Sequence, residues 1–242
     1  MRAMTDVATM ARAMDFCSST LPRPRHLLRL RRTVILVAVA VGLLTLAAAF
    51  APGTLAVVDE PISDWLRGRG SMDWWRHLSD YGSSRVYVPV AVLAAIVLWN
   101  RCRSLALTWP VLIAVGSVVN VVLKVLVDRE RPDDPLAGVA LAAYPSGHAI
   151  HATLFLGLLP PTIYLLTRRA WTVWMTGPLA ALMVVGVGAS RVALGAHWPT
   201  DVVSGVLIGV ALLVAADLTV ELAEERRLPH LANLKPSRWR RS

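Results

Sequence analysis

Charged side chains are scarce in this sequence. They account for 17% of the 242 residues, whereas hydrophobic residues account for 55% and the mean hydropathy is +0.54. Typical soluble domains carry about 25% charged residues. The composition therefore argues against an ordinary soluble domain and predicts a protein that lies largely within a membrane.

Cysteine is nearly absent too, because Cys17 and Cys102 are the only two. This number excludes a disulfide-rich framework, and neither cysteine has metal-ligating neighbours at a useful spacing. We therefore expect neither a disulfide bond nor a cysteine-bound metal. Lysine is equally rare, so arginine carries nearly all of the positive charge.

Six apolar segments are long enough, or nearly so, to cross a bilayer, which takes about 20 residues of helix. They cover residues 33–51, 83–99, 104–126, 148–166, 171–189 and 199–222. Nothing repeats at a fixed period and no linker divides the chain. The sequence therefore predicts an all-α, polytopic membrane protein, with a bundle of six transmembrane helices over residues 33–222. Residues 1–32 and 223–242 are expected to form basic cytoplasmic tails.

Two local features modify the predicted bundle. Between the first and second spans, apolar residues recur at helical spacing on either side of Gly68 and Gly70. This pattern predicts two short helices that lie in the membrane interface. Within the fourth span, Pro160 and Pro161 predict a break into two pieces near Leu159, because proline lacks a backbone donor.

Positive charge predicts the orientation of the bundle, since short cytoplasmic loops retain Lys and Arg. With the N-terminus inside, the inner segments hold 17 of the 25 Lys and Arg residues, 7 and 6 of them in the tails and 2 in each inner loop. We therefore expect a multi-pass protein of the plasma (inner) membrane with both termini in the cytoplasm. The net charge of +9 is concentrated in the tails, where anionic inner-leaflet lipid is a simpler partner than nucleic acid.

Three polar clusters fall at the predicted outer ends of helices. K-x6-RP, with Lys124 and Arg131, follows the third span, and YPSGH, residues 144–148, begins the fourth. The third cluster, SRVALGAHWPTD, occupies residues 190–201 between the last two spans. A helical bundle can bring these ends together although they are far apart in the sequence.

The first two clusters have structural explanations as well as functional ones. Lys124 lies on one helical face with Ser117 and Asn120, and by itself it fits an end residue whose ammonium group reaches the interface. Ser146 is the predicted N-cap of the fourth span, and the amides that follow it form a potential anion site. Many helices begin in this way, so this signal alone is weak.

The third cluster is ambiguous when considered alone. Asp201 lies four residues after His197, in the first turn of the last span. Its carboxylate could accept a hydrogen bond from one imidazole nitrogen and leave the other nitrogen free. The alternative is an acid that stabilises the helix dipole.

Together the clusters indicate an anion site. Lys124, Arg131 and Arg191 are three cations with Asp201 as the only evident counter-charge, and such a site would repel itself when empty. A bound dianion resolves the repulsion. Phosphate fits best, because arginine can donate to two of its oxygens at once.

These motifs resemble the three-part signature of the type 2 phosphatidic acid phosphatase (PAP2) superfamily, which also includes glucose-6-phosphatase and vanadium haloperoxidases. All eleven residues of the signature are present, namely Lys124, Arg131, Pro132, Pro145, Ser146, Gly147, His148, Ser190, Arg191, His197 and Asp201. The six-span layout resembles the bacterial branch of integral-membrane lipid phosphatases.

The resemblance implies a mechanism. His197 attacks phosphorus and forms a phosphohistidine while Asp201 holds its ring, and His148 protonates the leaving oxygen and later activates water. The implied phosphate-binding residues are Lys124, Arg131, Ser146, Gly147 and Arg191. The resemblance implies no metal and no other cofactor.

The substrate implied by the resemblance is a lipid phosphomonoester or diphosphate, hydrolysed outside the cytoplasm. Polyprenyl diphosphate, recycled in cell-wall synthesis, is the leading expectation, with phosphatidylglycerophosphate and phosphatidate as close alternatives. A vanadate-dependent oxidase is a second class, although the haloperoxidase relatives are soluble. A non-enzymatic lipid transporter or scaffold is a third, but it would favour charges along a path rather than at one face.

Other polar residues near the clusters are expected to have lesser roles. His151, one turn after His148, is expected to pack in the core, and His77 is expected at the surface. Four other charged residues are expected to form a solvated rim that influences which lipid headgroup binds. They are Asp128, Arg129, Asp133 and Asp134.

Overall fold

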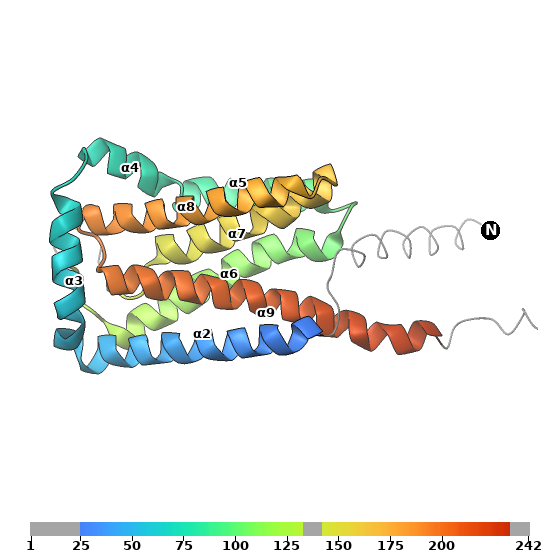
Figure 1. Cartoon of the computed structure of the whole chain (residues 1–242), viewed down its shortest axis with the longest axis horizontal. Coiled ribbons are helices and arrows are strands. Elements are labelled where there is room, and N and C mark those ends of the chain that lie inside the picture. Colours follow the sequence, from blue (N-terminus) through green and yellow to red (C-terminus); the bar gives the residue numbers. More distant parts are fainter. Residues whose placement is uncertain (1–24, 133–141, 233–242) are drawn as a thin grey trace, which may run out of the picture.

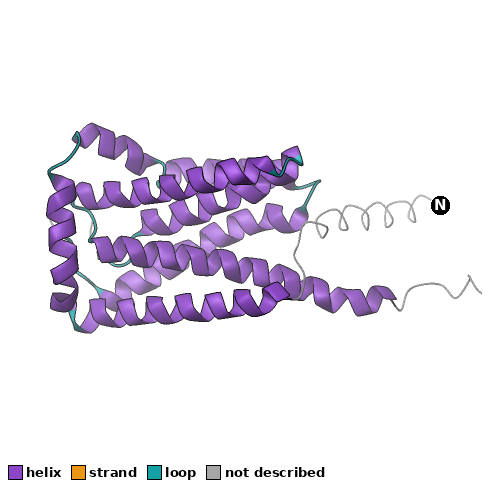
Figure 2. Cartoon of the chain, viewed as in Figure 1, coloured by secondary structure: helices purple, strands orange, loops and turns teal. Residues whose placement is uncertain are grey.

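The computed structural model describes residues 25–132 and 142–232, and among them the side chains from 32 to 219. Within these ranges the chain forms helices joined by loops and no strand (Figure 2). The helices are α2 (Arg25–Phe50), α3 (Pro52–Arg67), α4 (Met72–Asp80), α5 (Ser84–Leu98), α6 (Arg103–Val127), α7 (Gly147–Thr167), α8 (Trp171–Ala193) and α9 (Pro199–Ala232). The all-α prediction is confirmed.

Six stretches are long and apolar enough to cross a membrane. They are Arg32–Phe50, Met72–Leu98, Arg103–Val127, Gly147–Thr167, Trp171–Ala193 and Pro199–Thr219. The second stretch combines α4 with α5, because α5 alone has only 15 residues. The prediction of six spans is confirmed by length and composition, although α9 continues to Ala232, well past the expected end of the sixth span.

The long helices lie side by side, and α3 crosses one end of the bundle (Figure 1). Its inner side buries Asp59 and Ser63, whereas its outer side exposes Ile62 and Trp65. α4 follows after a turn in which Gly70 has a φ of +71°, a conformation that suits glycine. The two short helices predicted in this part of the chain are present as α3 and α4, although the second apolar stretch includes α4.

α7 is the central helix of the bundle. It packs against α6, α8 and α9, and 67% of its most apolar stretch is buried, against 6% for α2. The predicted break in this span is wrong, because α7 runs unbroken through Pro160 and Pro161. The two prolines remove two backbone donors, but their fixed φ is compatible with a helix.

Two glycines let α9 approach α7 closely. A Cβ atom at Gly205 would lie 2.6 Å from the carbonyl oxygen of Ser146, and one at Gly209 would lie 2.6 Å from Cβ of Thr153. Their i, i+4 spacing places both on one face of α9, as in helix pairs that pack through small residues. This contact sets the distance between the starts of α7 and α9.

Cys102, which precedes α6, is disulfide-bonded. The expectation of no disulfide is therefore wrong. The partner cysteine lies outside the described residues. Both cysteines were expected on the same side of the membrane, so the predicted topology does not keep them apart.

Candidate active site

The three predicted clusters meet at the end of the bundle that α3 crosses. Lys124 and Arg191 lie in the last turns of α6 and α8, and His148 and Asp201 lie in the first turns of α7 and α9. His197 lies in the loop between α8 and α9. The alternating directions of these helices bring the clusters to one end (Figure 1).

His197 is held by a backbone carbonyl. The side chain is buried, and Nδ1 donates a hydrogen bond of 2.7 Å to the carbonyl oxygen of Ala143. Because a carbonyl oxygen can only accept, Nδ1 carries the proton and Nε2 of the neutral ring has an available lone pair. Asp201, the expected hydrogen-bond partner, has Oδ2 3.9 Å from Nδ1, which is beyond hydrogen-bond distance.

The surroundings of His197 favour its neutral form. Burial is the main cause that holds its pKa well below the usual 6.5, and the nearby cations Arg191, Lys124 and Arg131 lower the pKa further. The hydrogen bond to Ala143 acts in the opposite direction but is the smaller effect. The structure thus brings the three predicted cations together around this histidine.

Asp201 pairs with Arg129, which follows α6. Its Oδ1 lies 2.6 Å from Nη1 of Arg129, and its Oδ2 accepts a hydrogen bond of 2.8 Å from the backbone N–H of Trp198. Nη2 of Arg129 lies 2.7 Å from Oδ2 of Asp59 on α3. The prediction that Arg129 belongs to a solvated rim is wrong, because its side chain is buried between two carboxylates.

The three cations of the signature contact neutral oxygen atoms. Lys124 is buried and donates to a carbonyl oxygen in the loop before α7. Arg131 donates to the carbonyl oxygen of Ala196 at 3.0 Å, and Arg191 donates to Oγ of Ser79 at 2.8 Å. These contacts orient the three cations. Ser79 on α4 had not been predicted near the site, since nothing in the sequence marks its position.

The YPSGH segment is fixed from two sides. Ser146 is fully buried and its backbone N–H donates to the carbonyl oxygen of Asp201 at 3.1 Å. It occupies the N-cap position, as predicted, although its side chain makes no capping hydrogen bond. At Gly147 a Cβ atom would lie 2.9 Å from Nδ2 of Asn120, so a larger residue here would displace the Asn120 side chain.

Several buried polar atoms at this end have no hydrogen-bond partner. Within the described residues they include Oγ of Ser146, Nε of Arg191 and Oδ1 of Asn120. Buried polar groups are nearly always paired in folded proteins. An anion with several acceptor oxygens would satisfy the hydroxyl group and the guanidinium N–H.

The secondary candidates lie mostly as expected. His151 is buried, stacks on Tyr87 with ring centroids 4.5 Å apart, and has Nε2 2.9 Å from Oγ of Ser117. His77 and Asp128 are exposed. The other two residues of the predicted rim, Asp133 and Asp134, lie outside the described residues.

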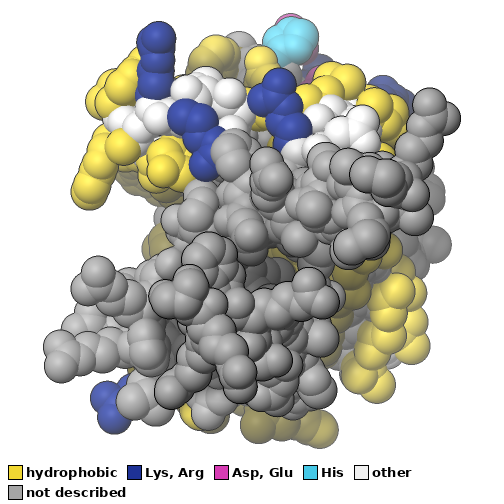
Figure 3. Space-filling view, turned by 90° about the vertical axis from the view of Figure 1, so that its right-hand side faces the viewer, with side chains coloured by type: hydrophobic (Ala, Val, Ile, Leu, Met, Phe, Trp, Pro, Cys, Tyr) yellow, Lys and Arg dark blue, Asp and Glu magenta, His cyan; other side chains and the backbone are white. Residues whose placement is uncertain are grey.

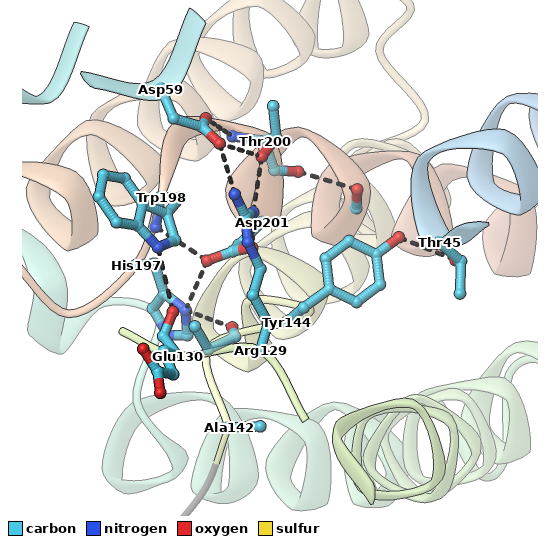
Figure 4. Close-up of polar contacts among 12 residues, drawn as sticks. Thr45, Asp59, Arg129, Glu130, Ala142, Tyr144, His197, Trp198, Thr200 and Asp201 are labelled. Atoms are coloured by element: carbon cyan, nitrogen blue, oxygen red, sulfur yellow. Dashed lines mark hydrogen bonds and ion pairs between the residues drawn. The ribbon is translucent and has the colours of Figure 1, made fainter. Parts of the chain in front are cut away.

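An apolar groove runs along the bundle beside the site. Its volume is about 510 Å³, and its walls come from α2, α6 and α9, with Gly42, Thr45, Leu123 and Ile208 among the lining residues. The hydroxyl group of Thr45 also lies 2.9 Å from Oη of Tyr144 (Figure 4). The groove is thus linked to the loop that carries Ser146.

The sequence is similar to known proteins of one superfamily. The model of the PAP2 superfamily matches residues 105–222. A decaprenylphosphoryl-5-phosphoribose phosphatase of Mycobacterium tuberculosis is 33% identical over 67% of this chain and 83% of its own length. An undecaprenyl-diphosphatase of Sulfolobus acidocaldarius is 32% identical over 54% of this chain, and the match spans 62% of that protein.

The fold also matches a solved structure. The crystal structure of a transmembrane PAP2-type phosphatidylglycerolphosphate phosphatase from Bacillus subtilis superposes with a TM-score of 0.68, and the match covers 78% of this chain and 96% of that one at 24% identity. With the intact signature assembled at one end of a six-span bundle, the chain is a multi-pass membrane protein that belongs to the PAP2 superfamily, in its branch of membrane lipid phosphatases.

Proposed function

We propose that this lipid phosphatase hydrolyses a polyprenyl diphosphate at the extracytoplasmic face through a phosphohistidine at His197. The observation that carries the mechanism is the hydrogen bond from Nδ1 of His197 to Ala143. It leaves Nε2 as the nucleophilic nitrogen, beside three cations that suit a phosphate group.

The reaction proceeds in two steps. Nε2 of His197 attacks phosphorus, the N–P bond forms, and the P–O bond to the leaving group breaks while His148 donates a proton to the leaving oxygen. Water then attacks phosphorus and gives a proton to His148, and the N–P bond breaks to release inorganic phosphate. His197 returns to its neutral state.

The transferring phosphoryl group is bound by the side chains of the signature. Lys124, Arg131 and Arg191 neutralise charge on its equatorial oxygens, where charge spreads in the transition state. Ser146 and Nε of Arg191 supply donors that are otherwise without partners. The amide of Gly147, at the positive end of α7, adds a further donor.

Two observations support a polyprenyl substrate. Two of the relatives above are phosphatases whose names specify undecaprenyl or decaprenyl compounds. The apolar groove between α2, α6 and α9 offers a lipid tail a place beside the headgroup. Phosphatidylglycerophosphate is the second candidate, because the solved relative acts on that class of lipid, and phosphatidate is the third.

The outward orientation of the site is supported by charge. Figure 3 views the end of the bundle opposite to α3, where Lys and Arg side chains are prominent. Arg101, Arg103, Arg168 and Arg169 are exposed and lie in or beside the loops that join α5 to α6 and α7 to α8. Short loops rich in arginine stay in the cytoplasm, and this rule supports an extracytoplasmic candidate site. The predicted tails, which we propose bind anionic inner-leaflet lipid, lie largely outside the described residues.

A panel of substrates tests this proposal. Purified protein in EDTA should release phosphate from polyprenyl diphosphate faster than from phosphatidylglycerophosphate or phosphatidate. His197→Ala should abolish turnover together with any acid-labile phosphoenzyme, whereas His77→Ala, which removes an exposed histidine, should retain both. Turnover by His197→Ala would rule out the nucleophile, and loss of wild-type activity in EDTA would rule out the metal-free scheme.

A further inference from the structure

A buried cluster of three charged residues lies behind the candidate nucleophile. Asp59 of α3 and Asp201 of α9 are fully buried, and the guanidinium of Arg129 lies between them with contacts of 2.7 and 2.6 Å (Figure 4). Thr200 joins the cluster, because Asp59 accepts hydrogen bonds from its backbone N–H at 2.9 Å and from its hydroxyl at 2.7 Å. The surface helix α3 is thereby attached to the first turn of α9.

With both carboxylates ionised, the cluster has a net charge. Two carboxylates and one guanidinium leave one negative charge, and Oδ2 of Asp201 lies 3.9 Å from Nδ1 of His197. If Arg129 were the only charged residue beside Asp201, the two would form an ion pair with no net charge. Asp59 offsets the charge of Arg129, so the negative field of the cluster at His197 is retained.

This charge acts when the ring of His197 becomes positive. In the neutral state Nδ1 donates to Ala143 and needs no carboxylate. Bonding of phosphorus to Nε2 leaves a proton on Nδ1 and gives the ring a formal positive charge, in surroundings that already contain Arg191, Lys124 and Arg131. A nearby net negative charge is therefore more favourable to the intermediate than to the free enzyme, which lowers the barrier to its formation.

Arg129 also fixes the direction of the Asp201 carboxylate. Nη1 of Arg129 holds Oδ1, and Oδ2 accepts from the backbone N–H of Trp198. Without Arg129 the carboxylate could turn away from His197, and its field would no longer be directed at the ring. We propose that Arg129 and Asp59 are positioning residues, which act through Asp201 on the phosphorylated state of His197. The inference rests on the phosphohistidine mechanism proposed above.

Isosteric and matched variants test the inference. Asp59→Asn preserves the shape and an acceptor oxygen but removes the charge, and Arg129→Ala removes the link while Arg129→Lys retains the charge. The controls are Asp64→Asn, an exposed acid on the same helix, and Arg85→Ala, an exposed arginine near the start of α5. For each variant, kcat and KM for a lipid phosphate and the rate of acid-labile phosphoenzyme formation are measured on monodisperse protein with a recorded Tm.

We expect Asp59→Asn and Arg129→Ala to lower kcat and the rate of phosphoenzyme formation by roughly 10- to 100-fold, the size of effect seen for outer-shell residues that orient metal-ligating histidines, with KM little changed. Arg129→Lys should restore part of the loss, and both controls should match the wild type. Unchanged kcat in folded Asp59→Asn and Arg129→Ala, or a rise in KM alone, overturns the inference.

Two further outcomes distinguish failure of the proposed mechanism from failure of the positioning role. Absence of an acid-labile phosphoenzyme in the wild type defeats the proposed mechanism itself, whereas a wild-type phosphoenzyme that both variants form at the normal rate defeats only the positioning role. If neither Asp59→Asn nor Arg129→Ala can be purified in folded form, the cluster serves stability and the positioning role is rejected.

Discussion

His197 has one ring nitrogen occupied by the carbonyl of Ala143 and the other available for reaction. The sequence identified this histidine through its spacing from Arg191 and Asp201, but it assigned the hydrogen bond to the wrong acceptor. Sequence spacing cannot distinguish a carboxylate four residues along the helix from a carbonyl 54 residues away. At the scale of single residues, identity was therefore predictable and pairing was not.

The lowered pKa of His197 predicts how the protonation of its ring depends on pH. A histidine of ordinary pKa is about nine-tenths protonated at pH 5.5, but His197 should remain neutral there, because burial and the adjacent cations disfavour its charged form. NMR of 15N-histidine-labelled protein, with His197→Gln to assign the signal, should show a ring that titrates well below pH 6.5. Titration near 6.5 would contradict the buried geometry.

The lowered pKa of His197 also makes the stability of the folded protein depend on pH. The folded state takes up this proton less readily than the unfolded chain, so the unfolded state binds more protons at mildly acid pH. The stabilising contribution of His197 is therefore fully present above about pH 6.5 and is lost as the pH falls below that value. His197→Gln should reduce the acid sensitivity of Tm between about pH 5 and 6.5.

At the scale of elements, the apolar runs predicted that the spans are helices and how many there are. They did not predict which helices contact one another. Nothing in the sequence showed that α3 would turn Asp59 inward onto the first turn of α9, or that α7 would be the central helix. Periodicity reveals which face of a helix is apolar, but the neighbour that covers this face is decided by packing of the whole bundle.

Packing of α9 on α7 predicts a sensitive position. Gly209→Val places side-chain atoms where even a Cβ would lie 2.6 Å from Thr153, and overpacking of this kind costs about 1 to 3 kcal/mol. The midpoint of thermal unfolding in detergent should fall. Gly177→Val on α8, where a Cβ meets nothing within 4 Å, is the control and should have a much smaller effect. Equal Tm values for the two variants would disprove the close contact.

The groove beside α2 predicts an effect on substrate binding. Gly42 lines the groove, and its Cβ position is open within 4 Å, so Gly42→Leu should fill the space without straining the helix. We expect kcat/KM to fall several-fold for a long-chain lipid phosphate and to stay unchanged for a short-chain one. Gly177→Leu, which also enters open space, should affect neither substrate. An equal loss for both chain lengths would argue against a tail in this groove.

At the scale of the whole molecule, the six spans place the candidate site and the arginine-rich loops at opposite ends of the bundle. This separation predicts the topology. An added cysteine at Asp73→Cys, on the exposed side of α4, should react with a membrane-impermeant maleimide in intact cells. Arg168→Cys, in the loop between α7 and α8, should react only after permeabilisation. The opposite pattern would place the candidate site in the cytoplasm.

By itself, the sequence determined the class of this protein and most residues of its candidate site. Long apolar runs have few structural solutions in a bilayer, and the three motifs specify residue types at short spacings that survive any arrangement of the helices. The tertiary structure decided what depends on distant segments: the burial of Arg129 between Asp59 and Asp201, the carbonyl partner of His197 and the contact of Ser79 with Arg191. Each of these joins residues more than 50 positions apart, and only packing of the complete bundle brings them within hydrogen-bond distance.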